Sequence, residues 1–217
     1  MADWDAHAER EERRYADGLA RLPDDPDGRQ KQLVRVAMAA GGAGLARLMQ
    51  GREAEARGWL ARSAERYRES FAGAPPSSWG RLIGAVKARL LAGDLAGAET
   101  DARWTLAQGP AESESSIGRY AAALSFLALG EDDEAAGHAA ALQEDEVFPP
   151  AVADALAALA AGDEDAYEDA ADRVLASFEE RDEYLEDVPV ADTVLVLEAL
   201  AEPRGLAVCP ASRLLPG

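Results

Sequence analysis

Residues 120–142 read YAAALSFLALGEDDEAAGHAAAL, and this stretch decides how the rest of the chain is interpreted. Apolar side chains recur at helical spacing as far as Leu129, and Gly130 then interrupts the pattern. Four acidic residues follow at positions 131–134. They are typical of a helix start, because negative charge is favourable in the first turn of a helix. Small residues then continue to Leu142, so the stretch predicts two helices joined by a tight glycine turn.

The same pattern recurs around Gly51, Gly93 and Gly162. A leucine stands three positions before each of the four turn glycines, and small residues occupy most positions five and nine places after them. Small side chains allow two antiparallel helices to approach closely, and glycine permits a left-handed turn conformation. The turns are 42, 37 and 32 residues apart along the chain. The pattern therefore predicts a series of helical hairpins.

Composition and chain breakers predict a single all-α domain of about ten helices. Aromatic residues make up only 6% of a chain that is 48% hydrophobic, which favours close-packed helices over a sheet. Glycine and proline clusters separate the predicted helices, which are 3–22, 29–50, 52–72, 79–92, 95–108, 114–129, 131–143, 151–161, 163–184 and 190–201. Within the domain, residues 1–28 are an N-terminal helix and loop, 29–187 are hairpin repeats, and 188–217 are a helix and tail that pack on the repeats.

Over about residues 36–180 the chain resembles the tetratricopeptide-repeat (TPR) family, because its turn spacing brackets the family's period of roughly 34 residues. Gly44 occupies the family's glycine place in the first repeat, and Pro110 stands where a helix pair normally ends. The family's tryptophan and its full Leu-Gly pair are missing from all four turns. The resemblance implies TPR-like antiparallel hairpins, arranged as an α–α superhelix or a compact helical array.

The resemblance also implies that the first helix of each hairpin lines a concave groove. The residues that would face this groove are Leu45, Leu48, Met49, Ile83, Lys87, Leu90, Tyr120, Leu124, Leu127, Val152, Leu156 and Leu159. Lys87 is the one charged residue among them. TPR domains that clamp a peptide carboxylate use asparagine, lysine and arginine there. Since this chain has no asparagine, the sequence disfavours such a clamp.

An apolar groove of this length is expected to be covered, because soluble proteins rarely expose large apolar patches. Three occupants are considered: the chain's own helix 190–201 with its tail, a second copy in a homodimer, or the amphipathic helix of a protein partner. The first of these is the favoured prediction, since it needs no second molecule.

A second resemblance concerns the C-terminus. Residues 200–208, LAEPRGLAV, and the closing Leu214-Leu215-Pro216 are similar to the endings of the all-helical immunity-protein family called Imm49. The similarity covers fewer than twenty residues. It implies an antagonist that binds a bacterial toxin and occludes it.

Charge is distributed unevenly along the chain, whose formal net charge is −19. Residues 1–110 carry 17 basic and 16 acidic side chains, whereas residues 111–217 carry 5 and 25. The acidic half disfavours nucleic acid and anionic lipid as partners, because both are bound by neutralising phosphates. It would suit a basic toxin. An acid-rich, arginine-rich chain with two lysines also resembles proteins of halophilic organisms or of GC-rich genomes.

Other sequence features indicate a cytoplasmic protein. The first residues, MADWDAHAEREERR, are charged and do not resemble a signal peptide. The longest nearly uncharged run, 148–162, is too short to cross a bilayer. Cys209 is the one cysteine, which excludes an internal disulfide.

Nothing in the sequence predicts a catalytic, metal or cofactor site. His138 is interpreted as a packing residue and His7 as part of a solvated helix, because neither has a nucleophile or ligand pattern beside it. The acidic run 163–169 lacks the glycine and glutamate of a calcium loop.

These observations predict a non-catalytic protein-interaction scaffold or regulator that uses the apolar groove. One alternative is an immunity or inhibitor protein that binds a toxin or enzyme. Another is a ligand-binding or enzymatic pocket between the repeats and the C-terminal helix. An enzyme would bring Tyr120, Lys87 and His138 together around one polar cavity.

Overall fold

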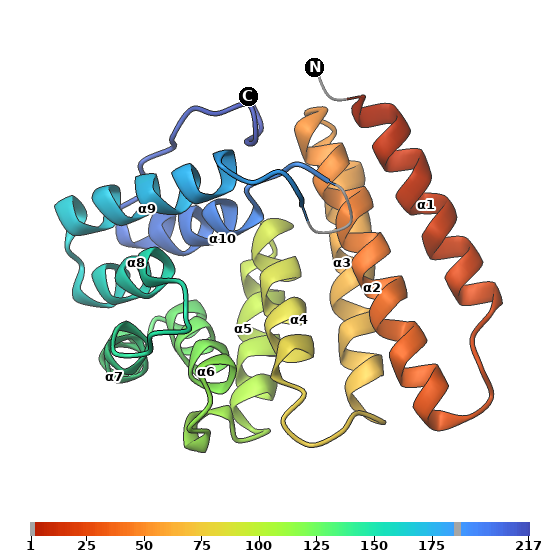
Figure 1. The fold of residues 1–217 in the computed structure, drawn as a ribbon, viewed down its shortest axis with the longest axis horizontal. Coiled ribbons are helices and arrows are strands. Elements are labelled where there is room, and N and C mark those ends of the chain that lie inside the picture. The colour runs from red at the N-terminus through yellow and green to blue at the C-terminus, as the bar shows by residue number, and fades with distance from the viewer. Residues whose placement is uncertain (1–2, 185–187) are drawn as a thin grey trace.

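The chain folds into ten α-helices in the computed structural model, which describes residues 3–184 and 188–217 (Figure 1). The helices are α1 (Trp4–Ala20), α2 (Pro26–Met49), α3 (Glu53–Phe71), α4 (Trp79–Leu91), α5 (Leu95–Leu106), α6 (Ser116–Leu129), α7 (Asp132–Gln143), α8 (Pro150–Ala161), α9 (Glu164–Glu179) and α10 (Asp192–Ala201). Short 3₁₀ helices lie at η1 (Pro110–Glu112) and η3 (Glu202–Arg204). The described residues form no strand, so the predicted all-α fold of about ten helices is confirmed.

Four of the helix-to-helix turns are made at the predicted glycines. Gly51, Gly93, Gly130 and Gly162 have φ between +65° and +72°, a left-handed conformation that strains residues with a Cβ atom. In the turn at Gly130, the amide of Glu131 donates to the carbonyl of Phe126 at 2.9 Å. The same five-residue bond closes the other three turns. Glycine therefore determines where each helix stops and how the next one begins.

Two helix ends differ from the sequence prediction by more than two residues. α2 begins at Pro26 rather than at residue 29, because Asp25 accepts a hydrogen bond from the amide of Gly28 at 2.7 Å and proline fits the first position of a helix. α9 ends at Glu179 rather than at residue 184. The hydroxyl of Tyr184 donates to the carbonyl of Phe178 at 2.9 Å, which turns the chain back over the end of the helix. Residues 185–187 of the predicted repeat segment lie outside the described residues.

The helices form a layered array in chain order (Figure 1). From α1 to α9, each helix packs against the next one along the chain. α4 also packs against α6, and α6 against α8, so these first helices of the hairpins lie in a row. α10 packs against α4, α8 and α9, which connects the end of the chain with its middle.

The C-terminal helix and tail are part of the main hydrophobic core. Val194, Val196, Leu197 and Leu200 of α10 belong to the same buried cluster as Leu124, Leu127 and Leu156 of α6 and α8. Leu214 and Leu215 of the tail are also buried in it, and the carbonyl of Leu214 accepts from the amide of Ala191 at 2.9 Å. The end of the chain and its inner helices thus share one core. No helix in the described part of the chain has the length and apolar character to cross a membrane.

Gly84 in α4 allows a close approach of α3, and we expect its replacement to destabilise the protein. A Cβ atom there would lie 2.6 to 2.8 Å from three ring atoms of Tyr67. Gly84→Ala should lower the free energy of unfolding by about 1–2 kcal/mol, because overpacking outweighs the gain in helix propensity. Gly58→Ala in α3 is the matched control, since a Cβ atom there meets no atom within 4 Å. It should raise stability by about 0.5–1 kcal/mol. Urea denaturation measures both, and equal stabilisation by the two substitutions would contradict the expected clash.

Candidate functional site

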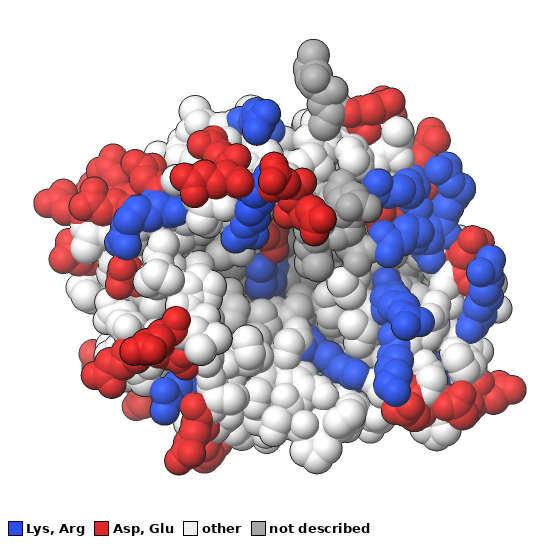
Figure 2. Space-filling view, in the orientation of Figure 1, with Lys and Arg blue, Asp and Glu red and all other residues white. Residues whose placement is uncertain are grey.

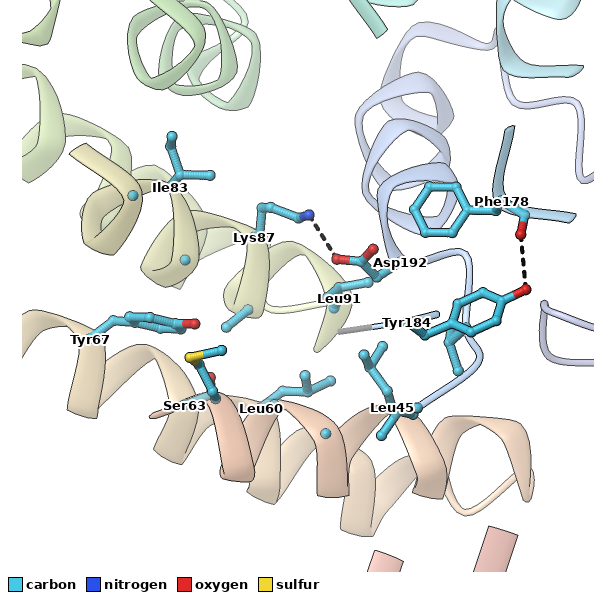
Figure 3. Close-up of a pocket in the computed structure, with 18 of the residues that line it drawn as sticks. Leu45, Leu60, Ser63, Tyr67, Ile83, Lys87, Leu91, Phe178, Tyr184 and Asp192 are labelled. Atoms are coloured by element: carbon cyan, nitrogen blue, oxygen red, sulfur yellow. Dashed lines mark hydrogen bonds and ion pairs between the residues drawn. The ribbon is translucent and has the colours of Figure 1, made fainter. Parts of the chain in front are cut away.

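A partly enclosed cavity of about 260 Å³ lies between α2, α3 and α4 on one side and residues 178–184 and 188–192 on the other (Figure 3). We call it the central cavity. Figure 2 shows the corresponding hollow on this face of the molecule. Its walls are mainly apolar and are formed by Met38, Leu45, Leu60, Ile83, Ala88, Leu91, Phe178, Val188 and Val190. Its polar residues are Ser63, Tyr67, Lys87, Arg181, Tyr184 and Asp192.

Four glycines lie in the helical walls of the central cavity. Gly41 and Gly42 of α2 and Gly80 and Gly84 of α4 all line the central cavity. A Cβ atom at Gly80 would meet no other atom within 4 Å, so this position borders empty space. At Gly84 the missing side chain instead makes room for the ring of Tyr67.

An ion pair between α4 and α10 lies on the wall of the central cavity. The ammonium of Lys87 lies 2.7 Å from a carboxylate oxygen of Asp192, and the two side chains are 19% and 25% exposed (Figure 3). Lys87 also donates to the hydroxyl of Thr193 at 3.5 Å. Burial lowers the pKa of Lys87, but attraction to Asp192, with contributions from Tyr120 and Tyr67, raises that pKa above its usual value. The ammonium is therefore charged at neutral pH.

Aromatic side chains surround this ion pair and the mouth of the cavity. Burial raises the pKa of Tyr120, and nearby Lys87 opposes this only in part, so the hydroxyl stays neutral at ordinary pH. At the outer end, the guanidinium of Arg181 stacks over the ring of Phe178, 3.8 Å from its centre. The hydroxyl of Tyr184 is engaged with the carbonyl of Phe178, as described above.

Of the three groups that an enzyme was expected to bring together, Lys87 and Tyr120 lie close enough to influence each other's pKa, whereas His138 lies elsewhere. Lys87 faces the central cavity, whereas Tyr120 packs against Phe148, with ring centres 5.4 Å apart. His138 lies on α7, stacked on Phe126 with 5.6 Å between ring centres. Burial is the main cause that lowers the pKa of His138.

The remaining reactive side chains lie away from the cavity. Cys209 is exposed on the C-terminal tail, and His7 contacts Trp4 on α1. Within residues 3–184 and 188–217, no group of three histidine, cysteine or acidic side chains is arranged to hold a metal ion. The cavity itself offers apolar contact and one paired cation and anion. That arrangement can bind and orient a small group.

Comparisons of the chain with protein-family models, with curated proteins and with solved structures find no match. The site is therefore interpreted from its own geometry.

The predicted groove residues fall into three groups. Leu45, Ile83 and Lys87 line the central cavity together. Leu90 borders two depressions between α4 and the C-terminal helix, Leu48 borders one of them, and Met49 is half-buried near the end of α2. The others lie in or against the core that α10 shares: Leu124, Leu127 and Leu156 are buried, and Tyr120 and Val152 are partly buried. The structure thus brings groove residues of α2 and α4 together around the central cavity, and Leu90 and Leu127 together at a second depression.

Several cavity residues were not predicted as site residues. Tyr67 belongs to the second helix of its hairpin, and the repeat pattern assigns the groove only to first helices. Tyr184 and Asp192 belong to the connection and helix that return to the repeats, more than 90 positions after Lys87. The acid at the start of the last helix was a usable signal for Asp192, because the groove offered one unpaired lysine.

Proposed function

We propose that the protein is a non-catalytic binding protein with a TPR-like architecture, and that its ligand site is the central cavity. The observation that carries the proposal is an apolar space of about 260 Å³, walled by three helices and by residues from the C-terminal third of the chain. Binding sites for small molecules combine concave apolar walls with a few placed polar groups. The paired Lys87 and Asp192 supply such groups here.

The burial of α6 and α8 supports a binding site that is confined to the space beside α2 and α4. A long groove for a partner helix needs accessible apolar side chains along α6 and α8, but Leu124, Leu127 and Leu156 are at most 1% exposed. These leucines belong to the same buried cluster as the apolar side chains of α10. This supports the chain's own C-terminal segment, rather than a homodimer or a protein partner, as the cover of these helices. The space beside α2 and α4 is what remains for a ligand.

A protein-interaction role, as an immunity protein or other inhibitor, is the second candidate. It is favoured by the segregation of charge, since acidic side chains crowd the α7–α9 side of the molecule and most basic ones lie on the α1–α3 side (Figure 2). A basic partner would be attracted to the acidic side. Such binding would weaken as the salt concentration rises.

Blocking the mouth of the central cavity tests the first proposal. We expect octanol, followed by ligand-observed NMR, to bind the wild-type protein at one site. Gly80→Met should weaken this binding at least tenfold, because the new side chain enters open space at the cavity wall. Gly58→Met is the matched control, since it adds the same side chain to a helical glycine with open surroundings away from the cavity. Failure of octanol and of the eight-carbon amide, acid and amine to bind the wild-type protein, or equal binding of octanol by the two variants, would refute the proposal.

A further inference from the structure

The ion pair gives the central cavity one polar wall, with both signs of charge at the same place. Lys87 and Asp192 are both lining residues, and their charged groups are 2.7 Å apart. The third charged lining residue, Arg181, is exposed and stacks on Phe178. The wall around the ion pair is therefore close to neutral, although each of its two groups carries a full charge.

Hydrogen-bonding capacity remains at both members of this pair. An ammonium has three N–H donors, and among the described residues those of Lys87 meet one oxygen of Asp192 at 2.7 Å and the hydroxyl of Thr193 at 3.5 Å. Within the described part of the chain, the second oxygen of Asp192 accepts only from the hydroxyl of Thr193, at 3.5 Å. A ligand head placed here finds one donor on Lys87 and one acceptor on Asp192.

We infer that the central cavity takes an uncharged amphipathic small molecule whose single polar head both donates and accepts hydrogen bonds, such as a primary amide. This inference rests on the proposed function of the cavity and specifies its ligand class. The amide oxygen accepts from Lys87 and the amide N–H donates to Asp192, while the apolar body lies against Leu45, Ile83 and Leu91.

A ligand with a negatively or positively charged head group is expected to bind less tightly beside the Lys87–Asp192 ion pair. A carboxylate that approaches Lys87 also approaches the carboxylate of Asp192, and an ammonium that approaches Asp192 also approaches Lys87. Each charged head would lose its hydration on entering an apolar space and would gain attraction and repulsion of similar size. A neutral head meets both groups favourably and loses less hydration.

The size of the cavity limits the apolar body. An apolar cavity of about 150 Å³ holds benzene, and typical sites for drug-sized ligands begin at about 300 Å³. At about 260 Å³, the central cavity suits a body of about six to eight carbon atoms. Octanamide, octanoate and octylammonium are therefore suitable probes, because they share one chain and differ in the charge of the head.

The test measures binding of these three probes, with octanol as reference, by isothermal titration calorimetry at neutral pH. The wild-type protein should bind octanamide at least tenfold more tightly than octanoate or octylammonium. Asp192→Asn leaves Lys87 unpaired and should shift the preference to octanoate. Lys87→Met leaves Asp192 unpaired and should shift it to octylammonium. The double variant removes both charges and should bind octanamide and octanol equally well.

The outcomes separate the two levels of the proposal. If octanol and all three probes fail to bind the wild-type protein, the cavity is not a ligand site and the proposed function itself is wrong. If octanol binds but octanoate matches or exceeds octanamide, or if the two single variants leave the order of preference unchanged, only the inferred ligand class is wrong. Thermal unfolding of each variant checks that it is folded. The two single variants should shift the probe preference in opposite directions, which a general loss of structure would not do.

Discussion

Removal of residues 188–217 is expected to abolish cooperative unfolding of the whole chain. The side chains that the segment contributes to the core include Val194, Val196, Leu197, Leu200, Leu214 and Leu215, each at most 7% exposed. Burying a valine or leucine stabilises a protein by about 1.5–3 kcal/mol, so their loss amounts to on the order of 10 kcal/mol. That equals the whole stability of a typical domain. Thermal denaturation and binding of a hydrophobic dye measure the result, and the truncated chain should bind the dye strongly.

A point substitution makes the same test without shortening the chain. Leu197→Asp places a carboxylate at a position that is 1% exposed in the core shared by α10 and the inner helices. It should reproduce much of the effect of the truncation, because an unpaired charge at a buried position is costly. Val147→Asp is the matched control, since Val147 is 89% exposed. Full stability of the truncated chain, without new dye binding, would mean that α10 is not required to cover the inner helices.

The regularity of the hairpins explains why most of the fold is predictable from the sequence. Each turn requires a left-handed residue, so glycine marks the helix ends at Gly51, Gly93, Gly130 and Gly162 with little ambiguity. The two helix ends that differ most from the prediction, the start of α2 and the end of α9, have local causes that hydrophobic periodicity does not reveal. Pro26 was interpreted as a breaker although it starts α2, and residues 180–184 continue the helical pattern although Tyr184 bonds back to Phe178.

The candidate site was only partly predictable because it depends on contacts between distant segments. The repeat pattern identifies Leu45, Ile83 and Lys87 by their place on first helices, and these residues do line the cavity. It contains no information on which groove residues the C-terminal segment covers. Asp192 reaches Lys87 across 105 positions, and that pairing depends on how α10 packs against α4. The periodicity of a single sequence predicts how neighbouring helices pack, but it does not predict which distant helices come into contact.

Replacement of Asp101 is expected to cause the largest stability loss of any single change to a charged residue outside the cavity. Asp101 on α5 is 1% exposed and is paired with both Arg68 of α3 and Arg89 of α4, the latter at 3.2 Å. It therefore holds three helices together at one point. Removing one member of a buried ionic network costs about 3–5 kcal/mol, because the remaining charges lose their partner. The two arginines are 37% and 19% exposed, so solvent compensates in part and we expect about 3 kcal/mol for Asp101→Ala.

Glu99 provides the matched control on the same helix. It pairs with Arg103 at 3.1 Å, but the two side chains are 47% and 64% exposed, so Glu99→Ala should change the free energy of unfolding by less than about 0.5 kcal/mol. Asp101→Asn should fall between the two, because it retains the shape and hydrogen-bonding oxygen but loses the charge. Urea denaturation at two salt concentrations measures all three variants. Asp101 and Glu99 lie on the same helix and differ in exposure, so an ionic contribution that depends on burial must make the loss of unfolding free energy larger at Asp101→Ala. An equal or smaller loss at Asp101→Ala would mean that the ion pairs of Asp101 do not stabilise the fold.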